Sequence, residues 1–329
     1  MRSSDLPRMT GNGLEYLPSI QDKTPANSVL ESKRQQSSHT SSKPPPLKAV
    51  QHIRRMPGGS QSHLLKCSDG LTYVVKCQNN PQGRRILINE LVCGFLAAQL
   101  NLPAPRTTVV QVDEEFLSQS KEMYMELPDG RIRWNAGPCF GSECQLHLRN
   151  EFDFWPEARI NQIINLRDHA GILVFDIWTS NRDFRQERFF DMTADTPFRF
   201  VMVDNGDCFR GEEWAFKDKA RPAMCPMRYV YRWISGIDSF EPWLSNLECQ
   251  ISRCAILQTI DRIPSEWFRR DRLLFKEVLL ELDRRRSKVR AKLLLLRQTA
   301  PNCFPLWLPP ESLARATAAW DSTIHVSSA

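Results

Sequence analysis

FDIWTSNRD at residues 175–183 and RFVMVDNG at residues 199–206 are the two segments that decide the predicted fold. The first continues an apolar helical pattern and ends in a polar loop that carries Asp183. The second is predicted to be a strand that ends at Asp204 and Gly206. Asp204 follows Asp183 by 21 positions, which is enough for one β-hairpin. Taken one at a time, the two aspartates are also consistent with ordinary turns at the end of a helix and of a strand.

A small sheet with one helix is predicted upstream of these segments. Gly58-Gly59-Ser60 is predicted to form a turn between two strands, and Leu71–Cys77 to form a strand with Lys76 near its end. The helical spacing of Arg85–Leu100 places Glu90 on a helix that Asn101 ends. The residues Thr107–Val112 are predicted to form another strand.

The glycine turn, Lys76 and Glu90 are residue types that can bind a polyphosphate. Glycines let a backbone approach a phosphate closely, and a lysine aimed at a polyphosphate needs an acidic partner to fix its position. We expect Lys76 to face a cleft and to support little of the core. Taken singly, a Gly-Gly pair is more often a plain turn, and Lys76 and Glu90 are more often solvent-facing side chains.

The C-terminal half is predicted to be mainly helical. Ile160–Trp178 and Asp271–Arg297 have the apolar spacing of helices. Between them, Arg188–Asp191 and Arg199–Asp204 are predicted to be strands joined by a turn at Ala194–Pro197.

The order of these features is that of a kinase catalytic core: glycine turn, strand lysine, helix glutamate, loop aspartate, hairpin, then Asp-x-Gly. Neither His-Arg-Asp nor Asp-Phe-Gly occurs in the sequence. In this order, Asp183 is placed to orient an attacking hydroxyl and Asp204 to hold Mg²⁺. The sequence therefore predicts an α+β, bilobal protein-kinase-like fold with a small β-rich N-lobe and a larger, mainly helical C-lobe.

Composition divides the chain of 329 residues into four expected parts. Residues 1–46 are rich in Ser and Pro and are predicted to be a disordered arm, because they lack the apolar surface that would offset the entropy of ordering. The N-lobe is expected at 47–135, the C-lobe at 136–300 and a C-terminal extension at 301–329.

Charge and cysteine usage narrow the class of protein. The net charge of +6 is mild and suits a polyphosphate cleft, so a nucleic-acid-binding module is kept only as a further hypothesis. The ten cysteines form no Cys-x-x-Cys pair, and the five-residue steps Cys139/Cys144 and Cys249/Cys254 do not match the spacing of zinc sites. Because residues 1–12 are polar and no apolar run is long enough to span a bilayer, we expect a cytoplasmic protein with reduced cysteines.

The sequence resembles the HipA-like kinase domain over roughly residues 52–216. The motifs that carry the resemblance are YVVKCQNNPQGRR (73–85), NEL (89–91), Gly141-Ser142, FDIWTSNRD (175–183) and VDNGDCF (203–209). The resemblance implies a fold akin to HipA and the phosphatidylinositol kinases, with ATP and Mg²⁺ as cofactors. It also implies transfer of the ATP γ-phosphate to a protein Ser/Thr or to a small-molecule hydroxyl.

The resemblance implies roles for three of these residues. Lys76 would contact the α- and β-phosphates, Asp183 would be the catalytic base and Asp204 the Mg²⁺ ligand. The nucleotide-binding role expected of Gly58, Gly59, Ser60 and Glu90 rests on the phosphate chemistry of a glycine turn and of a lysine with an acidic partner.

One position departs from the family pattern. Arg188 stands where the family has a metal-binding Asn, and the nearby Gln186 is a candidate replacement ligand. A catalytically inactive, nucleotide-binding pseudokinase that acts as a protein-interaction module is therefore the second hypothesis. The expected partners are ATP and a protein or small-molecule substrate; no membrane is expected, and a nucleic acid is the least favoured partner.

Overall fold

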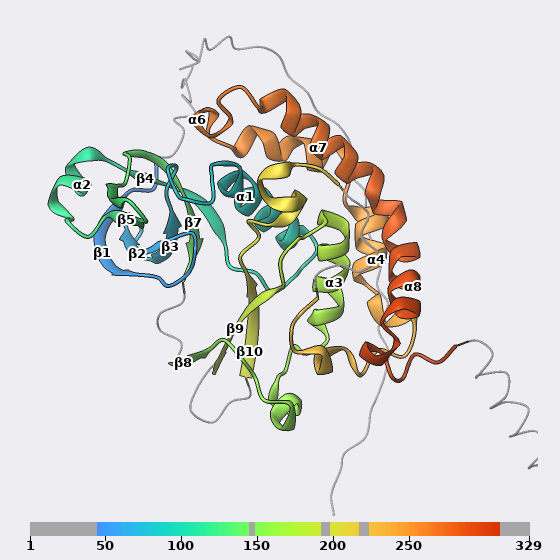
Figure 1. Cartoon of the computed structure of the whole chain (residues 1–329). Helices are drawn as coiled ribbons and strands as arrows, with labels where there is room; N and C mark the ends of the chain where they lie inside the picture. The colour runs from blue at the N-terminus through green and yellow to red at the C-terminus, as the bar shows by residue number, and fades with distance from the viewer. Residues whose placement is uncertain (1–44, 145–148, 192–197, 217–223, 310–329) are drawn as a thin grey trace, which may run out of the picture. The chain divides into compact units, whose positions relative to one another are not determined.

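The computed structural model describes residues 45–144, 149–191, 198–216 and 224–309 (Figure 1). The predicted arm lies outside the described residues except for its last two positions, and so does the predicted turn at Ala194–Pro197. Of the expected C-terminal extension, residues 301–309 are described.

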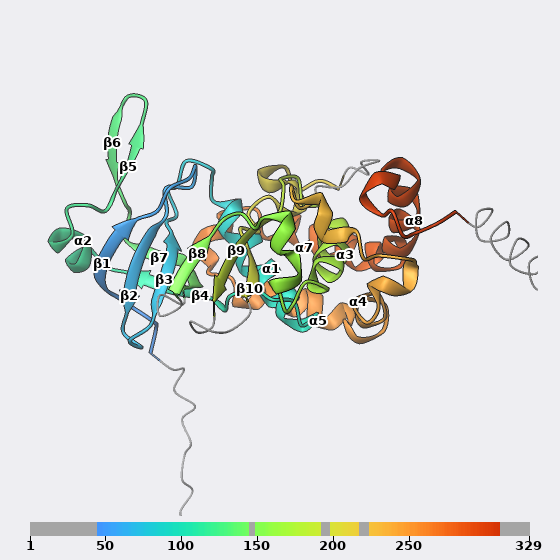
Figure 2. The same cartoon turned by 90° about the horizontal axis from the view of Figure 1, so that it is seen from below.

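A five-stranded antiparallel sheet forms the N-terminal lobe, with the strand order β1-β2-β3-β7-β4 (Figure 2). A two-stranded hairpin, β5–β6, projects beyond this sheet in Figure 2. The elements of this lobe are β1 (Ala49–Arg55), β2 (His63–Cys67), β3 (Thr72–Lys76), α1 (Arg85–Gln99), β4 (Thr107–Val112), α2 (Glu114–Gln119), β5 (Tyr124–Leu127), β6 (Gly130–Arg133) and β7 (Gly137–Glu143). Since β7 pairs with both β3 and β4, the sheet extends past the boundary expected at residue 135, to Glu143.

Helix α1 ends where the sequence predicts. Asn101 adopts the left-handed conformation, with φ of 54°. The backbone N–H groups of Asn101 and Leu102 donate to the carbonyl oxygens of Ala98 and Ala97, at 3.1 and 3.0 Å. This is the Schellman pattern, which satisfies carbonyls that the helix end would otherwise leave unpaired. Apolar residues of α1 are fully buried in the core that the C-terminal helices share, so the helix that carries Glu90 is fixed by packing.

The C-terminal lobe combines a three-stranded antiparallel sheet, in the order β10-β9-β8, with helices. Its strands are β8 (Arg149–Phe152), β9 (Gln186–Asp191) and β10 (Phe198–Val203). Its α-helices are α3 (Asp168–Thr179), α4 (Trp243–Ser245), α5 (Arg253–Gln258), α6 (Ser265–Phe268), α7 (Arg272–Arg285) and α8 (Val289–Thr299). Shorter helical segments are η1 (Glu157–Gln162), η2 (Cys208–Glu213), η3 (Arg228–Tyr231), η4 (Ile237–Phe240), η5 (Asn246–Gln250), η6 (Thr259–Arg262), η7 (Arg286–Lys288) and η8 (Pro301–Cys303).

The prediction of one helix over Ile160–Trp178 is wrong at its N-terminal end, because α3 begins only at Asp168. The preceding segment pairs with the edge of β10 instead. Ile163 forms a parallel bridge with Phe198, and the Asn165 side chain both donates to the Phe200 carbonyl and accepts from its N–H, at 3.0 and 3.1 Å. These tertiary hydrogen bonds replace the helical ones that the apolar spacing predicts.

The predicted long helix at Asp271–Arg297 is divided into α7 and α8 by the 3-10 segment η7. At this break the Arg286 guanidinium donates to the carbonyl oxygens of Glu248 and Ile251, at 3.3 and 2.7 Å, and contacts Asp283. The chain is helical on both sides of this break. The prediction of helix is therefore right, but the prediction of one continuous helix is wrong.

The predicted architecture is confirmed: a β-sheet N-terminal part precedes a mainly helical C-terminal part. The buried apolar residues form two clusters, one under the N-terminal sheet and one that joins α1 to the C-terminal helices. Within the described ranges, no helix has the length and apolar character needed to cross a membrane.

Candidate functional site

A cavity of about 530 Å³ is lined by residues of the β1–β2 turn, β3, α1 and β7 together with the loop and hairpin of the C-terminal lobe. It brings together all of the site residues predicted from the sequence. These are Gly58, Gly59, Ser60, Lys76, Glu90, Asp183, Gln186 and Asp204, and Arg188 lines the same cavity.

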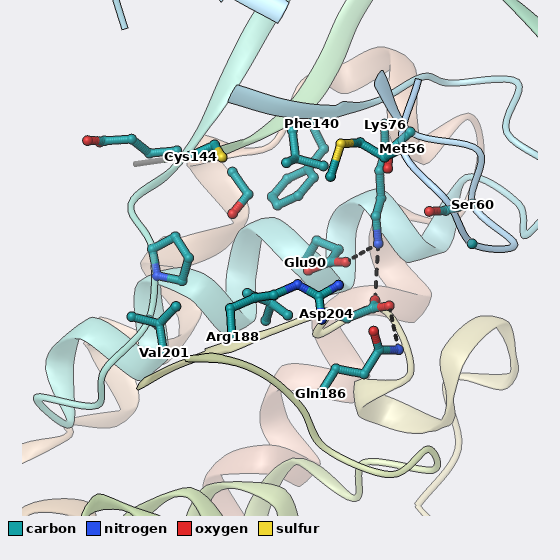
Figure 3. A pocket seen from close by; sticks show the side chains of 18 of the residues that line it. Met56, Ser60, Lys76, Glu90, Phe140, Cys144, Gln186, Arg188, Val201 and Asp204 are labelled. Carbon is teal, nitrogen blue, oxygen red and sulfur yellow. Dashed lines mark hydrogen bonds and ion pairs between the residues drawn. The ribbon is translucent and has the colours of Figure 1, made fainter. Parts of the chain in front are cut away.

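Lys76 is the centre of a charge cluster in this cavity (Figure 3). Its Nζ lies 2.5 Å from Glu90 Oε1 and 3.1 Å from Asp204 Oδ1. The other Glu90 oxygen accepts a hydrogen bond from the Asn205 N–H at 2.9 Å. Strand β3 and helix α1, which are near each other in the sequence, are thereby joined to the end of β10, which follows Lys76 by 128 residues.

Burial makes this cluster different from the solvent-facing lysine that was the alternative interpretation. The side chains of Lys76 and Glu90 are only 7% and 4% exposed, whereas Asp204 is 36% exposed. The expectation that Lys76 supports little of the core is therefore wrong. A buried ammonium that lost its carboxylate partners would be strongly unfavourable, so the three charges depend on one another.

The pKa values follow from burial and from these neighbours. Burial alone would lower the pKa of Lys76, but Glu90 and Asp204 outweigh it and raise that pKa above its usual range. Burial raises the pKa of Glu90, with Lys76 opposing and Asp204 adding to the effect. Burial would also raise the pKa of Asp204, but Lys76 and hydrogen bonds lower it to about 2. Asp204 is therefore ionised and Lys76 protonated at neutral pH.

The backbone after β10 has the shape that the Asp-x-Gly motif requires. Asp204 adopts the left-handed conformation, with φ of 61°. A Cβ at Gly206 would lie 2.7 Å from Ile86 Cγ2 on α1, which is closer than atoms can pack. Glycine at this position therefore lets the loop approach α1 and brings Asp204 within reach of Lys76.

Gln186 and Arg188 reach the cavity from one face of β9, because alternate residues of a strand share a face. Gln186 Nε2 donates to Asp204 Oδ2 at 3.1 Å. Arg188 Nη1 forms an ion pair with the exposed Asp153 at 2.7 Å. The intervening residue, Glu187, is buried on the opposite face of the strand.

Asp183 lies exposed in the loop between α3 and β9. Its N–H donates to Asn181 Oδ1 at 3.3 Å, and Asn181 Nδ2 donates to the buried Asp176 at 3.1 Å. Asp176 is paired with the fully buried Arg185 guanidinium. Arg185 Nη1 also donates to the carbonyl of Val203 and to Asn205 Oδ1, at 3.1 and 2.9 Å. One buried ion pair therefore holds the Asp183 loop and the Asp204 loop together.

Sequence analysis did not identify this ion pair. A signal is present in the sequence, since Asp176 is the one charged residue in the apolar run from Gly171 to Trp178. A carboxylate in such a run needs a buried partner. The partner, Arg185, could only be chosen once the loop was folded.

Sequence analysis also missed the apolar part of the lining. Val74, Phe140 and Val201 come from β3, β7 and β10, and Figure 3 shows Phe140 and Val201 on opposite sides of the space near Glu90 and Arg188. The cavity thus has an apolar portion beside its charged portion. A ligand with a flat apolar part and an anionic part would match both.

Comparison with known proteins gives a family match and several similar structures. Residues 50–189 match the family model of HipA-like kinases, which confirms the resemblance seen in the sequence. No curated protein matches the chain.

Three solved structures illustrate the similarity. The Golgi casein kinase with Mn and ADP bound shows 14% identity over 77% of this chain and 74% of its own, with a TM-score of 0.48. Hydra Fam20 with sugar shows 11% identity over 78% and 86%, with a TM-score of 0.44. The Helicobacter pylori proinflammatory kinase CtkA shows 13% identity over 76% and 99%, with a TM-score of 0.46. With the family match and the two-part architecture, the chain is similar to the HipA-like kinases and has a kinase-like fold.

Proposed function

We propose that the chain is an ATP-dependent kinase that transfers the γ-phosphate of ATP to a hydroxyl group. The observation that carries the proposal is the Lys76 ammonium, which is held between Glu90 and Asp204 in the same cavity as Asp183. A lysine fixed by a buried carboxylate can bind the α- and β-phosphates in one defined position. A surface lysine at a strand end would not need two carboxylates within 3.1 Å of its Nζ.

The two portions of the cavity suit the two parts of ATP. Val74, Phe140 and Val201 offer apolar contact to the adenine ring. The turn at Gly58-Gly59 lines the same cavity as Lys76, and its glycines let the backbone approach phosphate closely. Gly58 has φ of 114°, a conformation that side chains disfavour, so the turn depends on glycine there.

Asp204 and Gln186 would hold a divalent cation. Mg²⁺ takes hard oxygen ligands, and the ionised, partly exposed Asp204 carboxylate meets that requirement. Gln186 donates through Nε2 to Asp204 and would have to turn its amide over to offer Oε1 as a ligand. When bound, Mg²⁺ neutralises charge on the phosphates during transfer.

Asp183 would orient the attacking hydroxyl. Its carboxylate is exposed in the cavity lining, and its loop is anchored by the buried Asp176–Arg185 pair. A carboxylate on a rigid loop can accept a hydrogen bond from a substrate hydroxyl and take up its proton. The substrate would be a protein Ser/Thr or a small molecule with a hydroxyl group.

Arg188 is the observation that favours the second candidate, a nucleotide-binding pseudokinase. Its guanidinium is always charged and lies two residues from Gln186 on the same strand face. If a second divalent cation bound next to Arg188, the guanidinium would repel it. Beside a phosphate it would instead neutralise charge, as an arginine finger does. The proposed kinase requires the second of these two roles.

Incubation of the purified chain with ATP labelled at the γ-phosphate tests the proposal. The reaction is run with Mg²⁺ or Mn²⁺, first on the chain alone and then with a cell lysate divided into protein and small-molecule fractions. Transfer that the wild type catalyses and Asp183→Asn does not would support a kinase, and the labelled fraction would identify the substrate class. A wild type that binds ATP but transfers nothing would support the pseudokinase.

A further inference from the structure

Three fully buried side chains with metal-binding atoms meet on the face of β9 that points away from the cavity. His169 comes from the start of α3, Glu187 from β9 and Cys225 from the segment before η3. The ligand atoms of the three residues all lie within 4.8 Å of one another. His169 Nε2 is 3.2 Å from Glu187 Oε2, and Cys225 Sγ is 3.6 Å from the same oxygen.

The orientation of His169 exposes a lone pair to this cluster. Its Nδ1 lies 2.8 Å from the Leu166 carbonyl, so the Nδ1–H donates there and Nε2 carries the lone pair in the neutral ring. The ring is stacked on Phe200 at a centroid distance of 4.0 Å, which fixes its plane. A histidine that donates one N–H to a backbone carbonyl and directs the other nitrogen inward has the arrangement typical of a metal ligand.

Glu187 is incompletely satisfied by the protein. Oε2 lies 3.2 Å from His169 Nε2 and accepts a weak hydrogen bond from the Cys225 Sγ at 3.6 Å, while the buried Oε1 has no hydrogen-bond partner among the described residues. Two acceptors 3.2 Å apart repel one another unless a proton or a cation lies between them. A buried carboxylate in this position therefore calls for positive charge within the cluster.

The two distances that involve Glu187 match those between ligands of one tetrahedral zinc ion, and the His169 and Cys225 ligand atoms lie within 4.8 Å of each other. With Zn–N and Zn–O near 2.0–2.1 Å and Zn–S near 2.3 Å, tetrahedral geometry separates N from O by about 3.3 Å and S from O by about 3.5 Å. The observed separations are 3.2 and 3.6 Å. The charge also balances, because one carboxylate and one thiolate neutralise Zn²⁺.

We propose that His169, Glu187 and Cys225 bind one Zn²⁺, with a water molecule as the fourth ligand. Thiolate, imidazole and carboxylate together favour Zn²⁺ over the hard cations Mg²⁺ and Ca²⁺. The ion would tie α3, β9 and the segment before η3 together. Since Gln186 and Arg188 flank Glu187 on β9, the zinc site would fix the strand that carries two residues of the cavity. Zn²⁺ would enter during folding, because all three ligands are buried.

Metal content and X-ray absorption of the full-length wild-type chain give the first test. The chain is expressed with added Zn²⁺, purified without chelator or a histidine tag, and analysed for zinc. We expect about one zinc per chain and a coordination shell with one sulfur and the remainder nitrogen or oxygen. A folded chain without zinc would overturn the proposal and indicate a buried His169–Glu187 ion pair. A shell with no sulfur, or with more than one, would overturn it as well.

Cobalt substitution identifies the residues. Co²⁺ incorporated during expression should give a thiolate-to-metal charge-transfer band in the wild type. Cys225→Ser should lose this band, whereas Cys249→Ser, at an exposed cysteine outside the cluster, should keep it. Asp204→Asn should keep it too, which separates this site from a metal bound in the cavity. Retention of the band in Cys225→Ser, or its absence from the folded wild type, would refute the assignment.

Discussion

Replacing Lys76 with methionine tests the charge cluster at the centre of the cavity. The substitution keeps most of the side-chain volume but removes the ammonium that lies 2.5 Å from Glu90 and 3.1 Å from Asp204. Two carboxylates then face one another, one of them nearly fully buried. Both stability and nucleotide binding should suffer, because the same ammonium serves the fold and would serve the phosphates.

The expected loss of stability follows from burial. Removing one partner of a buried ion pair costs about 3–5 kcal/mol. Asp204 is partly exposed and Glu90 can take up a proton, so Lys76→Met should lower the free energy of unfolding by about 3 kcal/mol, near the low end of that range. Glu90→Gln should cost less, about 1–2 kcal/mol, since Lys76 keeps Asp204 as a partner.

Urea unfolding at pH 7 and calorimetry with Mg²⁺ and ATP measure the two effects. Lys66→Met is the matched control, since Lys66 is an exposed residue of the adjacent strand β2 and should change stability by no more than about 0.5 kcal/mol. Unfolding of Lys76→Met at the same urea concentration as the control would show that the Lys76 ammonium does not stabilise the fold. The nucleotide assignment fails if the variant remains folded and binds ATP as tightly as the wild type.

Four further predictions concern the cavity and the N-terminal sheet. Asp183→Asn should lower turnover by about 10²–10⁴-fold and leave ATP affinity unchanged, as single-turnover kinetics and calorimetry would reveal; a parallel loss of ATP affinity would argue against a base. Asp204→Asn should weaken Mg²⁺-dependent ATP binding and turnover together, and unchanged metal dependence would remove Asp204 as a ligand. Arg188→Ala should lower turnover by at least about tenfold if its guanidinium neutralises phosphate charge; equal or higher turnover would mean that Arg188 obstructs a metal position instead. Burial, aided by His52 and Arg55, lowers the pKa of His63 to about 4. As the pH falls below about 6.5, His63 takes up a proton in the unfolded chain before it does so in the folded chain. The free energy of unfolding should therefore decrease as the pH falls from about 6.5 toward 4, and the decrease measured by urea unfolding should be smaller for His63→Gln.

Local signals in the sequence were sufficient for the elements that carry the cavity. The spacing of α1 and its end at Asn101, the hairpin of β9 and β10, and the glycine turn are set by contacts between near neighbours. These elements appear where expected because propensity, capping and packing all favour the same conformation.

The elements that were predicted wrongly are those that distant residues control. The segment 160–167 has helical spacing, yet Asn165 and Ile163 bond to β10. The helix at 271–297 has no sequence break, yet Arg286 finds carbonyl partners at Glu248 and Ile251. Periodicity cannot report such hydrogen bonds, because their partners lie 35 or more residues away.

The sequence by itself determined the order of the motifs. A glycine turn, Lys76, Glu90, Asp183 and Asp204 follow one another as in a kinase-like domain. Only the tertiary structure decided that Lys76 is buried between two carboxylates and that one ion pair, Asp176–Arg185, holds both aspartate loops.

Only the tertiary structure, too, brought His169, Glu187 and Cys225 together. Glu187 lies beside Gln186 in the sequence, but the alternation of a strand directs them to opposite faces. The physical reason is common to all of these cases. Motif order is a property of the chain, whereas burial and charge pairing depend on which distant segments exclude water from one another.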